Sequence, residues 1–101
     1  MAQALIWSEE ALNDIRNIAE YIERDSPFYA EQVVERLFDL TDELPVNPKL
    51  GRIVPELHDD TVRERFVYSY RLIYELRDEA IEVLAIIHGK RLLESVERFK
   101  P

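Results

Sequence analysis

The sequence predicts an α+β protein in which a helical hairpin packs on a mainly antiparallel β-sheet of about four strands. Apolar residues recur at spacings of three and four in the first half of the chain, which is typical of amphipathic helices. The second half changes to a period of two, which is typical of strands. Between the halves, residues 45–55 hold three of the five prolines and one of the two glycines, which predicts the main loop. At 101 residues, the chain fits a single domain, residues 1–101.

The chain opens with a predicted strand followed by a helix. Residues 4–7 are short, apolar and rich in strand-forming side chains. Ser8 then offers a side-chain oxygen to the unpaired N–H groups of a helix start. Glu9 and Glu10 place negative charge where the helix dipole favours it. The helix has an apolar stripe made of Leu12, Ile15, Ile18, Ala19 and Ile22.

A second helix is predicted to begin at Pro27, directly after the first one ends at Asp25 and Ser26. Proline is tolerated at a first helical position because its missing N–H would be unpaired there anyway. Pro45 closes this helix. Its apolar stripe consists of Ala30, Val33, Val34, Leu37, Leu40, Thr41 and Leu44. Two such helices with a tight connection predict an antiparallel hairpin whose stripes need a common surface.

Three strands are predicted in the second half, at residues 62–69, 70–77 and 81–88. The third is almost continuously apolar, which is typical of a central strand covered on both faces. Strict alternation assigns four of its residues to one face: Ile81, Val83, Ala85 and Ile87. Gly89 permits a sharp exit, and residues 91–99 predict a short C-terminal helix. Its expected inward side chains are Leu92, Val96 and Phe99.

Charge is distributed unevenly along the chain. The formal net charge is −8, which disfavours nucleic acid as a direct partner. Residues 1–50 carry 4 Lys and Arg against 11 Asp and Glu, whereas residues 51–101 carry 9 against 10. One interpretation is a solvated acidic helical surface in front of a mixed sheet. The alternative is a bipolar molecule whose cationic half meets an acidic partner.

Composition and spacing exclude several classes of site. The chain has no cysteine, so it contains no disulfide and no thiolate metal site. His58 and His88 lie in no metal-binding spacing, and we expect neither a metal nor another cofactor. The apolar runs are too short to cross a bilayer, and the first residues lack the charged start of a signal peptide. We therefore expect a cytoplasmic protein without a membrane partner.

Five side chains of the second half form the candidate site: Arg63, Arg65, Arg71, His88 and Arg91. The period of two puts Arg63 and Arg65 on one face, and Arg71 is expected to approach them from the next strand. Converging guanidiniums can clamp phosphates or carboxylates, and a nearby histidine can act as an acid, a base or a phosphate donor. The pattern alone favours the alternative, a solvated sheet face whose arginines pair with glutamates.

An ordered series of motifs extends over most of the chain, from Ile6 to Leu93. The motifs are Trp7 with ALNDI at 11–15, IAEYI at 18–22, SP at 26–27 with Ala30, Leu44, Pro48, GRIVPE at 51–56, VRE at 62–64, YRLIY at 70–74 and HGKR at 88–91. In their order and spacing the chain resembles the ParE/RelE superfamily of bacterial toxin–antitoxin toxins, also described as plasmid stabilisation proteins. The resemblance implies a helical hairpin on an antiparallel sheet.

The superfamily divides by mechanism. RelE-like members are ribosome-dependent mRNA endonucleases that need no metal, whereas ParE-like members inhibit DNA gyrase and have no established hydrolytic centre. Both are neutralised by a cognate antitoxin that wraps the toxin. The Ser-Pro helix boundary, the GRIVPE loop and the His-x-x-Arg ending resemble the ParE branch. A nuclease of the other branch is disfavoured because the lysine-rich loop is reduced to Lys49, no tyrosine follows Tyr74, and the net charge is −8.

The resemblance therefore implies a gyrase-inhibiting binding protein, not an enzyme, that an antitoxin holds inactive. The alternatives are a RelE-like endoribonuclease and an inactive homologue that retains only antitoxin binding. In the RelE-like alternative, the catalytic groups would be Arg63, Arg71, His88 and Arg91. In every case, these four residues and Arg65 are expected to contact the antitoxin or the target. Nucleic acid is expected only through the antitoxin complex. A homodimer and a toxin–antitoxin hetero-oligomer both stay open.

Overall fold

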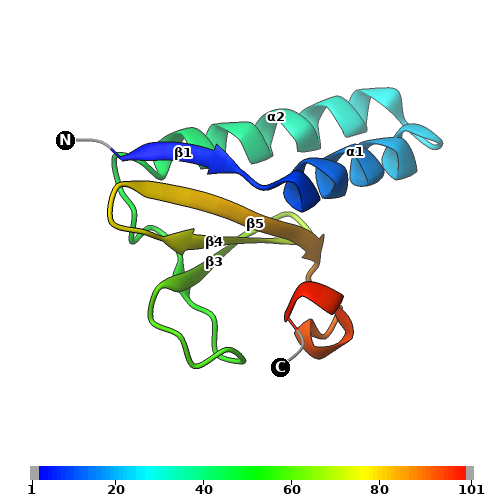
Figure 1. Ribbon diagram of the computed structural model, residues 1–101. Helices are drawn as coiled ribbons and strands as arrows, with labels where there is room; N and C mark the ends of the chain where they lie inside the picture. Colours follow the sequence, from blue (N-terminus) through cyan, green and yellow to red (C-terminus); the bar gives the residue numbers. More distant parts are fainter. Residues whose placement is uncertain (1–2, 100–101) are drawn as a thin grey trace.

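The computed structural model describes residues 3–99, and Figure 1 shows a strand and two helices followed by the rest of the sheet. The elements are β1 (Ala4–Trp7), α1 (Glu9–Glu23), α2 (Pro27–Glu43), β2 (Arg52–Ile53), β3 (Val62–Val67), β4 (Tyr70–Leu76) and β5 (Ala80–His88). Two short 3₁₀ turns follow, Leu93–Ser95 and Glu97–Phe99. The first two residues, on which the expected location partly rests, lie outside the described residues. Within residues 3–99, no helix is long and apolar enough to cross a membrane.

The strands form one mixed sheet in the order β1-β5-β4-β3-β2. β1 runs parallel to β5, and every other neighbouring pair is antiparallel. The predicted α+β architecture is confirmed, with five strands in place of about four. The additional strand, β2, consists of only Arg52 and Ile53 within the proline-rich loop, and two residues are too few to show a period.

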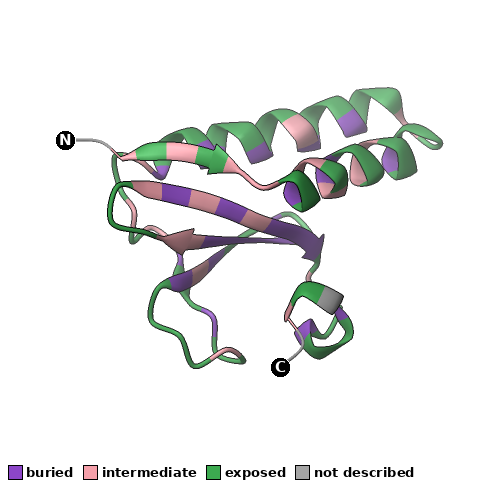
Figure 2. Ribbon diagram, viewed as in Figure 1, coloured by how far each residue is buried: buried purple, intermediate pink, exposed green. Residues whose placement is uncertain are grey.

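The helical hairpin covers one face of the sheet, with α1 and α2 side by side (Figure 1). Both helices begin as the sequence predicts. The Ser8 hydroxyl accepts a hydrogen bond from the Ala11 N–H at 3.0 Å, and the Ser26 hydroxyl accepts one from the Tyr29 N–H at 3.1 Å. Figure 2 shows the buried residues of the helices turned toward the sheet. The sheet contributes these buried residues to this first core: Val67, Leu72, Tyr74, Ile81, Val83 and Ile86.

A second, smaller core lies on the opposite face of the sheet. Its buried members are Val54, Val62, Ile73, Ala85, Ile87, Leu93 and Val96. The continuous C-terminal helix predicted for residues 91–99 is absent, and two 3₁₀ turns take its place. A 3₁₀ helix has three residues per turn, so its inward positions are Leu93, Val96 and Phe99, each three residues apart. Leu92, expected to point inward, is instead 63% exposed.

A β-bulge in β5 reverses the alternation in the middle of the strand. Ile73 of β4 pairs with Ala85, and the next residue, Tyr74, pairs with Val83, so Leu84 has no partner in the register. The extra residue shifts the phase of the strand by one. Val83 therefore packs toward the helices and Ala85 toward the second core, which corrects the single face expected from strict alternation. After the bulge, His88 pairs with Tyr70 on the helix side.

Candidate functional site

The structure distributes the five candidate side chains over three separate places. Arg63 and Arg65 lie on the helix-facing side of β3 and contact the proline-rich loop. The Arg63 guanidinium donates to the Gly51 carbonyl at 2.8 Å, and that of Arg65 donates to the Leu50 carbonyl at 3.3 Å. These two arginines therefore hold loop carbonyl groups that the short strand β2 leaves unpaired.

Arg71 lies on the opposite face of the sheet from Arg63 and Arg65. In the antiparallel register, Arg65 faces Leu72 and Phe66 faces Arg71. Side chains of directly paired residues share a face, so Arg71 belongs with Phe66. Its guanidinium carbon lies 5.9 Å from the centre of the Phe66 ring. The expectation that Arg71 approaches Arg63 and Arg65 is therefore wrong. The strand register pairs Arg71 with Phe66, and Phe66 lies on the opposite face of β3 from the two arginines.

Arg71 is enclosed by two carboxylates. Its Nε donates to Glu64 Oε1 at 2.8 Å, and its Nη2 bonds to the same oxygen. On the other side, Nη1 and Nη2 form a fork with the two oxygens of Glu56 at 2.9 and 3.1 Å. Arg52 donates to the remaining Glu64 oxygen at 2.6 Å. The Glu64 side chain has no solvent exposure and that of Arg71 only 6%.

The electrostatics of this network favour the charged forms of Arg71 and Glu56. Burial opposes the charge of Arg71, but the hydrogen bonds and charges of Glu56 and Glu64 outweigh it and raise the Arg71 pKa. The hydrogen bond from Arg71 in turn holds the pKa of Glu56 below its ordinary value of 4.5. A guanidinium occupied in this way has no free edge for a substrate anion.

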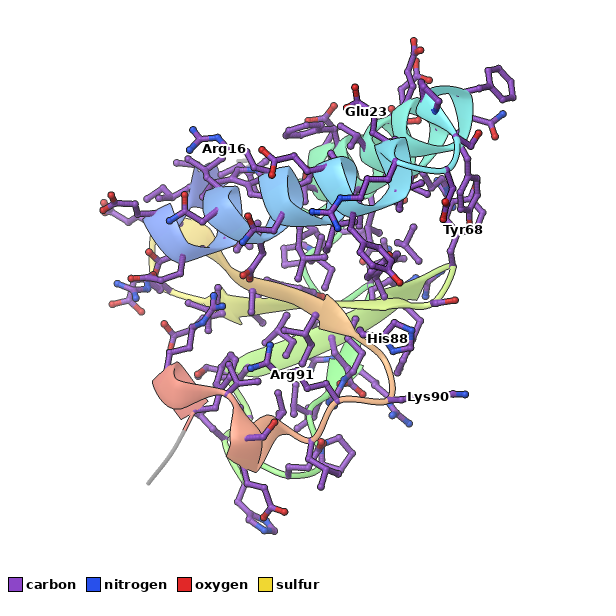
Figure 3. All side chains as sticks on the ribbon, turned by 90° about the vertical axis from the view of Figure 1, so that its right-hand side faces the viewer. Arg16, Glu23, Tyr68, His88, Lys90 and Arg91 are labelled. Carbon is purple, nitrogen blue, oxygen red and sulfur yellow. The ribbon has the colours of Figure 1, made fainter. Side chains whose placement is uncertain are left out.

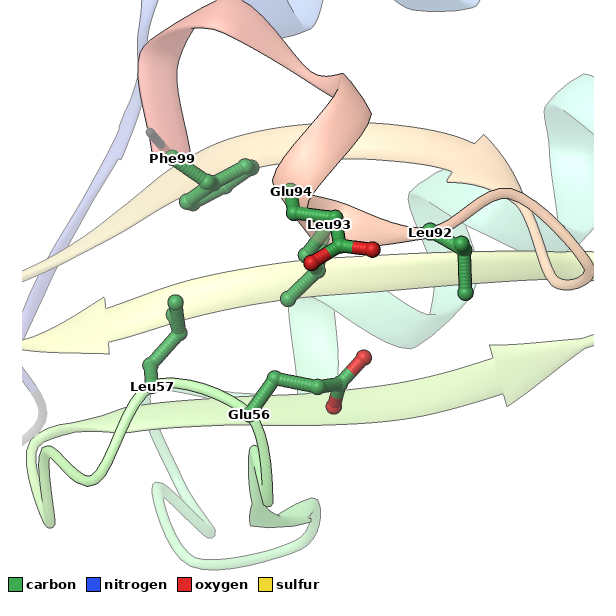
Figure 4. A pocket seen from close by; sticks show the side chains of 6 residues that line it. All are labelled: Glu56, Leu57, Leu92, Leu93, Glu94 and Phe99. Atoms are coloured by element: carbon green, nitrogen blue, oxygen red, sulfur yellow. The ribbon is translucent and has the colours of Figure 1, made fainter. Parts of the chain in front are cut away.

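A cavity of about 490 Å³ lies beside this network, between Glu56 and the C-terminal turns (Figure 4). Leu57, Leu93 and Phe99 supply apolar walls, and Glu94 lies at its opposite side. Because the Glu56 carboxylate forms the fork with Arg71, an anion that approached from this cavity would have to displace Glu56 first.

The third place is the end of β5, where His88 is the last residue of the strand and Arg91 follows three residues later (Figure 3). They border a groove of about 370 Å³ between α1 and the end of β5. The groove is lined by Asp14, Asn17, Ile18, Tyr21, Tyr70, Ile86, Ile87, His88 and Arg91. We call it the end groove. Arg65, His88 and Arg91 are all exposed. Arg65 donates to the Leu50 carbonyl, whereas His88 and Arg91 are the two exposed candidates that border the same groove.

The His88 ring is oriented by two neighbours. Its Nδ1 accepts a hydrogen bond from the Lys90 backbone N–H at 3.2 Å. A neutral ring whose Nδ1 accepts must carry its proton on Nε2. The ring also packs edge-on against Tyr70, with the centroids 5.9 Å apart. Burial raises the pKa of Tyr70, and nearby Tyr29 and Tyr21 add to the shift, so the phenol is neutral at physiological pH.

The sequence reasoning missed Tyr21 and Tyr70 as neighbours of His88. Two signals were present. Tyr21 follows Ile18 by three residues and so lies beside it on α1. β4 and β5 are joined by a turn, so their residues pair outward from it in order. This order pairs Tyr70 with His88 only when the extra residue of the bulge is included. Within the described residues, no three side chains among His, Asp and Glu are placed to hold a metal ion.

The chain is similar in sequence and in fold to known proteins. The family model described as the ParE toxin of the type II toxin–antitoxin system parDE matches residues 5–93. Toxin RelE2 of Caulobacter vibrioides is 33% identical over 93 residues, which are 91% of this chain and 100% of that protein.

Solved structures show the same fold at lower sequence identity. The chromosomal ParDE system from P. aeruginosa gives a TM-score of 0.73 at 18% identity, covering 88% of this chain and 98% of that chain. A mutant of the E. coli toxin RelE in the free state gives a TM-score of 0.64 at 22% identity, covering 89% of this chain and 86% of that chain. The family match and the identity to RelE2 together show that this chain belongs to the ParE/RelE superfamily of type II toxin–antitoxin toxins.

Proposed function

We propose that the chain is a ParE-like toxin, a binding protein that inhibits DNA gyrase and is held inactive by a cognate antitoxin. The observation that carries the choice is the separation of the candidate cations. Arg71 is enclosed by Glu56 and Glu64, and Arg63 is bound to a loop carbonyl on the other face of the sheet. The ParE family match over residues 5–93 supports the same choice.

Cutting RNA through its 2′-hydroxyl requires an acid, a base and cations around a single phosphate. To reach such a phosphate, Arg71 would have to leave Glu64, whose side chain has no solvent exposure. Arg52 would remain on the other Glu64 oxygen, but losing one partner of a buried ion pair costs about 3–5 kcal/mol, and the lower end applies here. A net charge of −8 adds repulsion against the phosphates of a ribosome. Both effects favour a protein target.

A cognate antitoxin is the expected partner because the matching family is defined as the toxin half of a two-protein system. The relative from P. aeruginosa is likewise described as part of a ParDE system. A neighbouring short reading frame that encodes a DNA-binding protein would identify the antitoxin. Its co-purification with this chain is the expected result, and free recovery of the chain from cells that express both proteins would contradict it.

The second candidate is a RelE-like, metal-independent endoribonuclease. It is favoured by the 33% identity to Toxin RelE2 and by the exposed pair His88 and Arg91. It predicts new mRNA ends on translating ribosomes. An inactive homologue that only binds antitoxin predicts no growth arrest when the chain is expressed alone.

The proposed function is tested by a supercoiling assay. Purified chain is titrated against gyrase acting on relaxed plasmid, and dose-dependent loss of supercoiling is expected. The control is the same preparation after heating, because contaminating small molecules would survive that treatment. Full supercoiling at a large molar excess of folded chain would exclude gyrase as the target.

A further inference from the structure

We propose that the end groove is a carboxylate-binding site that accepts an acidic peptide segment of a protein partner. The inference deepens the proposed function and rests on it for the claim that the partner is a protein. It concerns the pair His88 and Arg91, which the internal hydrogen bonds described above leave available at the protein surface.

Three polar side chains that line the groove can donate hydrogen bonds: His88, Arg91 and Asn17. Because Nδ1 of His88 accepts from the Lys90 N–H, the neutral ring carries its proton on Nε2, which is therefore a donor. Arg91 offers a guanidinium, and Asn17 lies across the groove on α1 with an amide that can donate. A guanidinium binds a carboxylate through paired, charge-assisted hydrogen bonds. The arrangement therefore fits an anionic oxygen-bearing group.

The charge of the groove is positive although the chain as a whole is acidic. Asp14 is the acidic residue that lines it, and its carboxylate is already occupied by the Ile86 N–H at 2.9 Å and by Arg98 at 2.9 and 3.0 Å. Among the side chains that the structure describes, no carboxylate forms an ion pair with Arg91. An incoming carboxylate thus meets the Arg91 guanidinium.

The walls of the groove are apolar and aromatic. Ile18 and Ile86 supply the aliphatic part, and Tyr21 and Tyr70 supply the rings. Tyr21 is 67% exposed, and exposed tyrosines beside arginine are typical of the centre of a protein–protein contact. At about 370 Å³, the groove has room for an acidic side chain together with an apolar neighbour. The ligand class is accordingly an Asp or Glu beside a leucine-sized residue.

A peptide fits this surface better than a nucleic acid strand. The next exposed side chains along α1 are Glu20 and Glu23, which border a separate hollow with Arg24. A nucleic acid strand that extended from the groove along α1 would bring its phosphates close to Glu20 and Glu23 and be repelled. A single carboxylate bound at Arg91 would not reach these acids. The net charge of −8 adds to the same difference.

The test is an NMR titration of the isotope-labelled full chain with a defined probe, the capped dipeptide acetyl-Leu-Asp-amide. The neutral acetyl-Leu-Asn-amide is its matched control, and adenosine monophosphate represents a phosphate source. We expect the aspartyl probe to shift the resonances of Ile18, Tyr21, His88 and Arg91. The asparaginyl probe should bind at least about tenfold more weakly, since a charged hydrogen-bond pair is lost.

Two variants assign the effect to the groove. Arg91→Gln should weaken the aspartyl probe about tenfold or more while the spectrum stays folded. Arg24→Gln removes an exposed arginine outside the groove and should leave the affinity unchanged. Equal binding of the two dipeptides, binding of adenosine monophosphate alone, or no shift at the solubility limit would each overturn the proposal. The titration involves no gyrase, so its failure is distinguishable from a failure of the supercoiling assay.

Discussion

Replacing Glu64 by glutamine should destabilise the protein more than any surface charge change. Glu64 has no solvent exposure and accepts hydrogen bonds from both Arg71 and Arg52. Glutamine keeps a single acceptor oxygen and directs its amide hydrogens at a guanidinium. The substitution therefore removes the buried negative charge and leaves Arg71 with Glu56 as its charged partner, whose side chain is 43% exposed.

The size of the effect follows from these contacts. Removing one partner of a buried ion pair costs about 3–5 kcal/mol. Glu56 remains on Arg71 and the glutamine oxygen can accept one bond, so the lower end, about 3 kcal/mol, applies. A domain of this size is stable by about 5–15 kcal/mol in total. With a denaturant slope of about 1.5 kcal/mol per molar urea, the unfolding midpoint should fall by about 2 M.

The assay is urea unfolding followed by circular dichroism, with two comparison variants. The double replacement Glu64→Leu with Arg71→Met removes both partners and should recover most of the loss, because no buried charge is left unpaired. Arg77→Gln removes two solvent-exposed ion pairs, with Glu75 and with Glu82, and should cost less than about 1 kcal/mol. The reasoning is refuted if Glu64→Gln lies within 1 kcal/mol of the parent, or if the double replacement is no more stable than Glu64→Leu alone.

Three further predictions concern the loop and its anchors. Tyr74→Phe leaves the Gly51 N–H and the Pro48 carbonyl, each 2.8 Å from the Tyr74 oxygen, without a partner. It should lower the free energy of unfolding in urea by about 2–4 kcal/mol, and a loss below about 1 kcal/mol would contradict this. Gly51→Ala should cost about 2–3 kcal/mol, because its Cβ would overlap a backbone carbonyl oxygen of β3; an unchanged midpoint would show that the loop moves freely. Arg71 lowers the Glu56 pKa, so the stabilisation is present above pH 4.5 and is lost as the pH falls through the folded-state pKa. Glu56→Gln should therefore lower the melting temperature at neutral pH and converge with the parent in acid; parallel curves would contradict the linkage.

The elements that the sequence predicts well are those with local causes. Ser8 and Ser26 cap their helices because a hydroxyl needs to reach only three residues ahead. The apolar stripes of the two helices follow from the helical period, which needs no knowledge of the partner surface. The C-terminal segment departs from this pattern, because residues 93, 96 and 99 fit a 3₁₀ spacing that an α-helical interpretation assigns to the wrong face.

The site depends on pairing between strands, which a single sequence does not specify. One unpaired residue, Leu84, reverses the phase of β5 and turns His88 toward Tyr70. The register of β3 against β4 places Arg71 and Arg65 on opposite faces of the sheet. The ion pairing of Arg71 with Glu64 was within reach of the pattern, since alternating arginines commonly pair with glutamates. The burial of Arg71 is not predictable in this way, because it also requires Glu56, in the loop between β2 and β3, to bond to the guanidinium.

The most direct test of the separated cations is a search for mRNA cleavage on translating ribosomes. Purified chain is added to a translation reaction, and primer extension maps the ends of the message. The account predicts no new ends at concentrations that abolish gyrase supercoiling, because Arg71 and Arg63 do not join His88 around one phosphate. New ends that disappear with His88→Gln, in a variant that still folds, would contradict it.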